Sequence, residues 1–204
     1  MKFILARKER MTQIFSEDGT VFAGTVLKTV PNVVTQVKSA ETDGYTAVQV
    51  GFEDQKAERL SKAVLGHLKG KALRVLKEFR VEDTADYAVG TEVALDTFAA
   101  GDEVSVAGTT KGKGFQGVVK RHGFHGGRRS HGQKHSEREP GSIGGGGRAG
   151  GRVAKGMKMG GRMGGDRVTV TGLKVLHVDT AKGEIIISGA VPGAKGTLVE
   201  VVSK

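Results

Sequence analysis

One internal segment, Thr109 to Gly165, differs from the rest of the chain in both charge and glycine content. It holds 13 of the 32 Lys and Arg residues, 19 of the 33 glycines and only two acids, Glu137 and Glu139. The other 147 residues carry 19 basic and 20 acidic side chains. The formal charge of +10 therefore belongs to this segment, and the remainder of the protein is nearly neutral. Such a concentration of positive charge indicates a polyanionic partner.

The segment lacks the apolar residues needed for a core of its own, because its few large apolar side chains follow no helical or strand period. Fixing a glycine backbone costs more conformational entropy than fixing any other residue. Long irregular segments inside compact domains are usually functional or disordered. A solubilising tail would lie at a terminus, whereas this segment is internal. We therefore expect an external phosphate-rich surface to supply the ordering energy.

The flanking regions have the pattern of antiparallel β-structure. Runs rich in β-branched and aromatic residues alternate with turns such as Asp18-Gly19 and Asp43-Gly44. One helix is expected at Gln55–Leu68, from apolar residues at helical spacing. The predicted strands are Thr12–Phe15, Thr20–Val30, Val33–Lys38, Tyr45–Phe52, Arg74–Glu82, Glu103–Ala107, Arg167–Thr171, Leu173–Val178, Glu184–Ser188 and Thr197–Val202.

Strands on both sides of the basic segment imply that it interrupts one β domain. A closed barrel is the expected solution, because closure removes exposed sheet edges. We predict a mainly β fold, with a closed barrel as the globular body in residues 1–108 and 166–204. One short helical region belongs to this body. A long irregular basic extension, residues 109–165, is inserted between its strands.

Several function classes are disfavoured by composition. The chain has no cysteine, which excludes disulfides, thiolate metal sites and a cysteine nucleophile. The apolar run Phe3–Ala6 is too short for a signal peptide, and no stretch approaches the roughly 18 apolar residues of a membrane span. We expect an intracellular protein with no membrane partner. Aromatic residues make up only 5 %, which leaves little for a base-stacking platform.

The segment Gly112–Gly117 matches the pattern G-x-G-x-x-G of dinucleotide-binding loops. That function requires a strand before the loop, a helix after it and an acid about 20 residues further on. Val118–Gly123 is a poor helix start, and Glu137 lies inside the basic segment after no strand. We interpret the motif as a flexible backbone that approaches phosphates, with Lys111 and Lys113 as cations. No P-loop motif occurs.

Four histidines, His122, His125, His131 and His135, have spacings similar to those of zinc ligands. Surrounding Arg and Lys side chains would repel a divalent cation, so contacts to phosphate, ribose and bases are favoured instead. Ser130 next to His131 lacks a nearby Asp and a nucleophile elbow. We predict no metal, no cofactor, no small-molecule substrate and no catalysis.

We predict that the cations and histidines of the extension bind RNA, together with the first cation after it. These residues are Lys111, Lys113, Lys120, Arg121, His122, His125, Arg128, Arg129, His131, Lys134, His135, Arg138, Arg148, Arg152, Lys155, Lys158, Arg162 and Arg167.

Four motifs in the extension, Thr110–Gly117, Lys120–Phe124, Ser130–Gly132 and Pro140–Gly144, resemble the universal family of large-subunit ribosomal protein three. The resemblance extends over essentially the whole chain. It implies a barrel of the translation-protein type, an extension threaded into large-subunit ribosomal RNA and a role in early subunit assembly. It also implies neighbouring ribosomal proteins as partners, a cytoplasmic location in the ribosome, and an extension tip at Gly144–Arg152 close to the peptidyl transferase centre. The alternative is a free-standing or chaperone-like RNA-binding module.

Two positions depart from the family pattern. Arg10 stands where a glycine commonly precedes Met11-Thr12, which would alter the local turn if that position needs a positive φ. No glutamine follows the Gly144 region, where bacterial members often carry a methylatable one. We therefore do not expect that modification in this chain.

Overall fold

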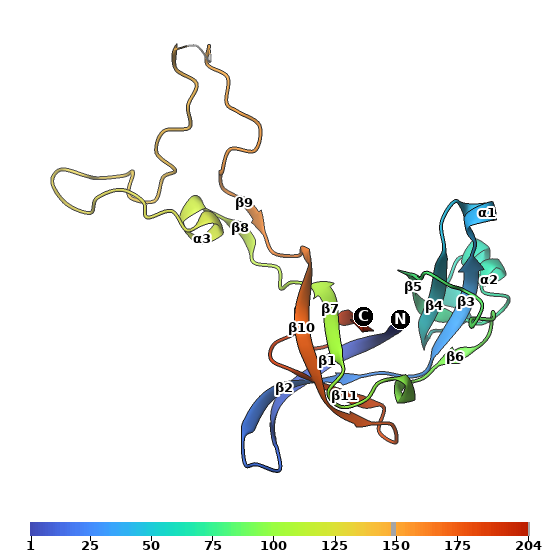
Figure 1. Cartoon of the computed structure of the whole chain (residues 1–204). Helices are drawn as coiled ribbons and strands as arrows, with labels where there is room; N and C mark the ends of the chain where they lie inside the picture. Colours follow the sequence, from blue (N-terminus) through green and yellow to red (C-terminus); the bar gives the residue numbers. More distant parts are fainter. Residues whose placement is uncertain (148–149, 204) are drawn as a thin grey trace. The chain divides into compact units, whose positions relative to one another are not determined.

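The computed structural model describes residues 1–147 and 150–203. The chain divides into two compact units, each described by itself below. One unit comprises Met1–Thr109 and the C-terminal segment from Arg167, and the other comprises Thr110–Asp166. Figure 1 shows the elements of both units along the chain.

The first unit contains a closed six-stranded barrel in the order β1-β12-β7-β10-β11-β2, with every neighbouring pair antiparallel. This confirms the predicted mainly β fold and its closed barrel. Buried side chains such as Ile4, Leu27, Val106, Ile185 and Val201 fill the interior. The strands are β1 (Lys2–Phe15), β2 (Val21–Lys28), β7 (Glu103–Thr109), β10 (Arg167–Asp179), β11 (Glu184–Ser188) and β12 (Leu198–Ser203).

Strand β1 begins ten residues before the predicted start at Thr12. A run of charged residues, 7–10, interrupts the apolar alternation and hides the strand in the sequence. The pairing of β1 with β2 shifts register between Lys8 and Arg10. The non-glycine residues with positive φ in the described chain are Glu53, Lys69 and His131. Arg10 therefore fits this strand without a left-handed backbone.

A second sheet, of order β5-β4-β3-β6, packs on the outer face of β1. Alternate residues of β1 serve two cores: Ile4 points into the barrel, whereas Phe3 packs in the second core. The Phe3 ring stacks on Phe79 with ring centroids 4.5 Å apart. The predicted single barrel is thus incomplete, because periodicity marks strands without assigning them to sheets. The strands are β3 (Asn32–Lys38), β4 (Ala47–Asp54), β5 (Leu73–Arg80) and β6 (Glu92–Val93).

A buried hydrogen-bond network fixes the backbone where the chain passes from the barrel to the second sheet. Asn32 is fully buried; its side-chain oxygen accepts from the Leu5 N–H at 2.8 Å, and its amide donates to the Val30 carbonyl at 2.9 Å. The Thr29 hydroxyl donates to the Leu5 carbonyl at 2.7 Å. An unsatisfied buried group would cost about 1–3 kcal/mol, so these bonds hold the crossing in one geometry.

The predicted helix Gln55–Leu68 is largely wrong. Only α2 (Lys62–His67) is α-helical, and it follows a 3₁₀ turn, η1 (Ala57–Arg59). Leu60 and Ser61 are extended, and the Ser61 hydroxyl caps the helix by accepting from the Val64 N–H. A serine that can cap a helix start competes with a continuous helix through the same position. The remaining short elements of this unit are α1 (Ala40–Asp43) and η2 (Leu95–Thr97).

Candidate nucleic-acid interface

The second unit, called the extension below (Thr110–Asp166), is an inserted arm whose two ends lie together. The Thr110 N–H donates to the Asp166 carbonyl at 2.9 Å. Further along, β8 (Gly114–Gln116) pairs with β9 (Gly161–Met163) in a short antiparallel ribbon. Among the other described residues of the arm, α3 (Val118–His122) is a short helix, and most of the backbone is irregular. Irregular backbone of this kind can follow an external surface rather than a core of its own.

Glycine is required at two places where the arm approaches itself. Gly164 has a φ of 74°, and a Cβ there would lie 2.1 Å from the Lys111 carbonyl oxygen. Gly126 has a φ of 80°, and its Cβ would lie 2.2 Å from the Glu137 carbonyl oxygen. Any side chain at either position would clash with backbone. At these points glycine therefore allows contact within the chain, in addition to the predicted approach to phosphates.

Helix α3 corrects the prediction that Val118–Gly123 would not start a helix. It spans five residues and follows Gly117. Gly123 caps its C-terminal end in the left-handed conformation, with a φ of 72°, and its N–H donates to the Val119 carbonyl. The preceding strand β8 lies inside the G-x-G-x-x-G motif and pairs antiparallel with β9. This arrangement lacks the parallel strand–loop–helix geometry of a dinucleotide site.

Two predicted RNA-binding side chains, Arg121 and His122, contact the same backbone carbonyl of the arm itself. The Arg121 guanidinium donates to the Met159 carbonyl at 2.8 Å, and a ring nitrogen of His122 lies 3.0 Å from the same oxygen. Both residues are half-buried. We call this set the clasp (Arg121, His122 and Met159), because it joins the two legs of the arm.

The other described cations of the extension are exposed, which leaves their charge available to a ligand. Arg129 is also paired with Glu137, 2.6 Å away. His125, His131 and His135 are exposed as well, while Arg148 lies outside the described residues. The exposed cations are Lys111, Lys113, Lys120, Arg128, Arg129, Lys134, Arg138, Arg152, Lys155, Lys158 and Arg162.

Arg167, the predicted site residue outside the extension, forms an ion pair with Glu200 of β12. Glu200 also lies 3.2 Å from Lys77 of β5, so one carboxylate neutralises cations from two other strands. The structure therefore gives Arg167 a partner within the first unit.

Phe115 is a candidate contact that the sequence prediction omitted. Its side chain is 79 % exposed on β8, opposite Arg162 in the strand register. An exposed aromatic ring beside cations is suited to stacking on a nucleic-acid base. The sequence did contain a signal for its exposure: residues 111–117 around Phe115 are lysine, glycine and glutamine, which cannot bury an aromatic ring.

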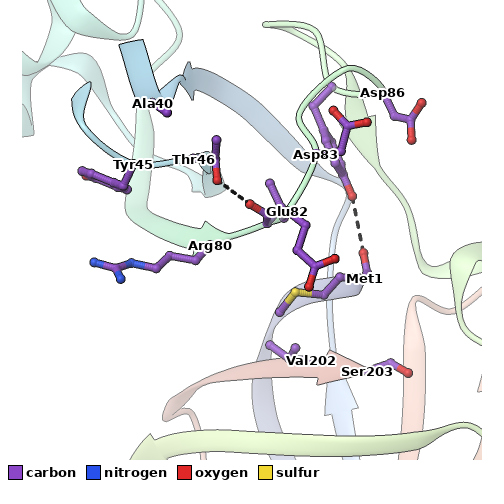
Figure 2. Close-up of a pocket in the computed structure, with 12 residues that line it drawn as sticks. Met1, Ala40, Tyr45, Thr46, Arg80, Glu82, Asp83, Asp86, Val202 and Ser203 are labelled. Carbon is purple, nitrogen blue, oxygen red and sulfur yellow. Dashed lines mark hydrogen bonds between the residues drawn. The ribbon is translucent and has the colours of Figure 1, made fainter. Parts of the chain in front are cut away.

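One cavity lies in the first unit and is lined by none of these cations. It has a volume of about 840 Å³ and lies between Met1, the end of β12 and the chain after β5 (Figure 2). The Thr46 hydroxyl donates to the Val81 carbonyl at 2.7 Å, and the Tyr87 hydroxyl donates to the Met1 carbonyl at 3.4 Å. Burial, followed by the nearby Asp86 charge, raises the pKa of Tyr87. The hydroxyl groups of Thr46 and Tyr87, which line this cavity, thus bind backbone carbonyls and are not arranged for catalysis.

Within residues 1–147 and 150–203, no three His, Cys, Asp or Glu side chains lie close enough together to hold a metal ion. In the same residues, no helix has the length and apolar character to cross a membrane.

Comparison with known proteins identifies the family. The sequence model described as Ribosomal protein L3 matches residues 76–190, more than half of the chain. The chain belongs to the ribosomal protein L3 family. The large ribosomal subunit protein uL3 of Herpetosiphon aurantiacus is 48 % identical over 200 residues, which cover 97 % of this chain and 94 % of that protein. The predicted resemblance is confirmed, and an L3 protein is a structural constituent of the large ribosomal subunit rather than an enzyme.

Membership of the L3 family covers both units, because residues 76–190 include the extension and the barrel strands on either side of it. The exposed cations therefore belong to a segment shared with L3 relatives.

Proposed function

We propose that this protein binds large-subunit ribosomal RNA through the extension and supports early assembly of the subunit. The observation that carries the proposal is the exposure of eleven cations on an irregular arm that has only three acids, Glu137, Glu139 and Asp166. Phosphates supply the charge that such an arm lacks, and the release of their counterions favours binding. Arginine forks bridge phosphate oxygens, and lysines add point charges.

Removing extension cations tests this binding against a control of equal charge. Lys155→Gln with Lys158→Gln should weaken binding of the full chain to large-subunit ribosomal RNA. The plot of log affinity against log salt should flatten by about 1.4–1.8, or 0.7–0.9 for each lost phosphate contact. Lys56→Gln with Lys195→Gln removes the same charge from exposed positions of the body and should leave the slope unchanged. Equal effects of the two pairs would argue against a role for the extension.

We further propose that the tip of the arm, Gly144–Arg152, approaches the peptidyl transferase centre. Because the chain has no cysteine, Gly146→Cys provides a single attachment point for an iron chelate that cleaves nearby RNA. A Cβ at Gly146 meets nothing within 4 Å, so the change fits the backbone. Purified subunits carrying this variant should be cleaved at peptidyl transferase nucleotides, whereas Lys195→Cys in the body should cleave elsewhere. Cleavage at those nucleotides from Lys195→Cys alone would contradict the proposal.

A chaperone-like RNA-binding module outside the ribosome is the alternative. Co-sedimentation distinguishes the two, since a ribosomal constituent remains near-stoichiometric with large subunits through washing. We expect that result and a location in the cytoplasmic ribosome. Recovery of most of the protein in RNA-free fractions of growing cells would favour the alternative.

A further inference from the structure

The β1–β2 hairpin extends beyond the strands that close the barrel. Strand β1 pairs with β12 only through Lys2–Arg7, and β2 pairs with β11 only through Gly24–Lys28. The remaining part, called the hairpin tip (Arg10–Ala23), projects from the barrel as the blue ribbon at the lower left of Figure 1. Its turn is ordered, with the Ser16 N–H donating to the Thr20 carbonyl at 2.9 Å. Among the described residues no third strand pairs with the tip, and at its base the Gly189 N–H donates to the Ala23 carbonyl at 2.8 Å.

The hairpin tip exposes large apolar side chains. Met11, Phe15, Val21 and Phe22 are 53, 64, 49 and 44 % exposed. Phe15 and Val21 are register partners, and side chains of register partners lie on the same face of a ribbon. Met11 shares that face, because it lies four residues from Phe15 along the strand. Clusters of exposed apolar side chains on a soluble protein mark interaction surfaces.

The edges of the hairpin tip also lack the usual protection of edge strands. In the strand pairings of the described residues, the outer edge of Arg10–Phe15 meets no other strand. Natural edge strands are commonly protected by charged side chains, proline or β-bulges. The register shift between Lys8 and Arg10 and the charges of Glu9 and Arg10 lie at the base of the tip, and residues 11–15 beyond them contain no charged residue or proline. Such an edge can accept an added strand, with affinity from backbone hydrogen bonds and specificity from alternate side chains.

The charge of the hairpin tip identifies the class of partner. Its turn carries two exposed acids, Glu17 and Asp18, against the single cation Arg10. Phosphate groups would be repelled here, in contrast to the extension with its eleven exposed cations. A protein strand with apolar and Lys or Arg side chains complements both the apolar face and the acidic turn.

We propose that the hairpin tip docks a neighbouring protein of the large subunit by strand addition along β1, through an extended, basic and apolar segment of that protein. This inference rests on the proposed place of the chain in an RNA-rich particle. The barrel then contributes a protein-binding surface in addition to holding the RNA-binding arm.

Photo-crosslinking in assembled particles tests the proposal. Cells expressing the full chain with Val21→p-benzoylphenylalanine are irradiated, and purified large subunits are analysed by mass spectrometry. We expect crosslinks to one extended peptide of a large-subunit protein. The same replacement of Lys182, which is exposed in the β10–β11 turn, should not crosslink to that peptide.

Crosslinks from position 21 to RNA alone, or no crosslinks in subunits that contain the chain, would overturn the docking surface and leave the proposed function intact. Absence of the chain from large subunits would overturn the proposed function and this inference with it. The two failures are therefore distinguishable in one experiment.

A charge reversal provides the second measurement. Glu17→Lys with Asp18→Lys should lower the amount of the crosslinked protein in purified subunits about tenfold, because like charges then face each other. The thermal midpoint of the isolated variant should stay within about 2 °C of the parent, since both side chains are exposed. Unchanged or increased occupancy of that protein would overturn the proposal.

Discussion

Arg7 and Glu53 link the barrel to the second sheet through a two-pronged ion pair. The Arg7 Nε and Nη2 atoms each donate to a Glu53 carboxylate oxygen at 2.8 Å. Arg74 of β5 lies 3.5 Å from the same carboxylate. Hydrogen bonding from Arg7 is the main cause that lowers the pKa of Glu53; partial burial opposes it. The ion pair therefore couples stability to the protonation of a single carboxyl group.

Glu53→Gln should reduce the stability of the full chain at neutral pH by about 1 kcal/mol, the range of a partly exposed ion pair. A carboxyl group with a depressed pKa stabilises the fold above its ordinary pKa of 4.5, and this stabilisation is lost as pH falls through the folded-state value. The difference between variant and parent should thus shrink as the pH is lowered from neutral to well below 4.5. Urea unfolding at the two pH values measures this. Glu58→Gln, at an exposed position of η1, serves as the control. An equal difference at both pH values would contradict the argument.

The exposure of single residues could be predicted from the sequence, whereas their contact partners could not. The exposure of the extension's cations could be expected, because no apolar period surrounds them. The partners of Arg121 and Arg167 could not, because Met159 lies 38 residues from Arg121 and Glu200 lies 33 residues from Arg167. Only the folded backbone brings such residues together, so composition overstates the number of cations that are free of contacts within the chain.

Strands and helices were predictable to different degrees. β11 was predicted at its observed bounds, because a run of three isoleucines lies between the breakers Gly183 and Gly189. β10 was predicted as two strands but is continuous through Gly172, where the pairing with β7 shifts between Val170 and Leu173. A bulge accommodates the glycine without ending the strand. The division into barrel and second sheet could not be predicted, because it depends on which strands pair.

The clasp should stabilise the β8–β9 ribbon, since two strands of three residues are marginal alone. Arg121→Ala removes one hydrogen bond, worth about 1 kcal/mol, and should speed exchange of the Lys113 amide about fivefold. That amide donates to the Met163 carbonyl at 2.9 Å and thus reports on the ribbon. Hydrogen exchange of the full chain provides the measurement. Lys120→Ala, at the neighbouring exposed position, should leave the rate unchanged. Similar acceleration by both variants would show that Arg121 acts only through charge.

With the proposed function, the chain as a whole separates folding from RNA binding. The first unit has two apolar cores, whereas the extension has one buried apolar residue among its described residues, Val118. Hydrophobic burial therefore stabilises the first unit without the extension. The extension in turn carries nearly all the excess positive charge. This separation predicts that one unit can be removed without unfolding the other.

Thr109 and Arg167 are register partners in the β7–β10 pair, so a two-residue turn can replace residues 110–166. A chain with Asn-Gly in their place should unfold cooperatively with a stability within about 1 kcal/mol of the parent, because the barrel pairings persist and loop length affects stability only weakly. Urea unfolding tests this expectation.

The same chain should lose most of its affinity for large-subunit ribosomal RNA and much of the salt dependence of binding. Cells relying on it should accumulate incomplete large subunits on sucrose gradients. If the barrel is stable and still binds the RNA with parental salt dependence, the RNA-binding surface lies on the first unit instead. If the barrel unfolds, the extension takes part in folding.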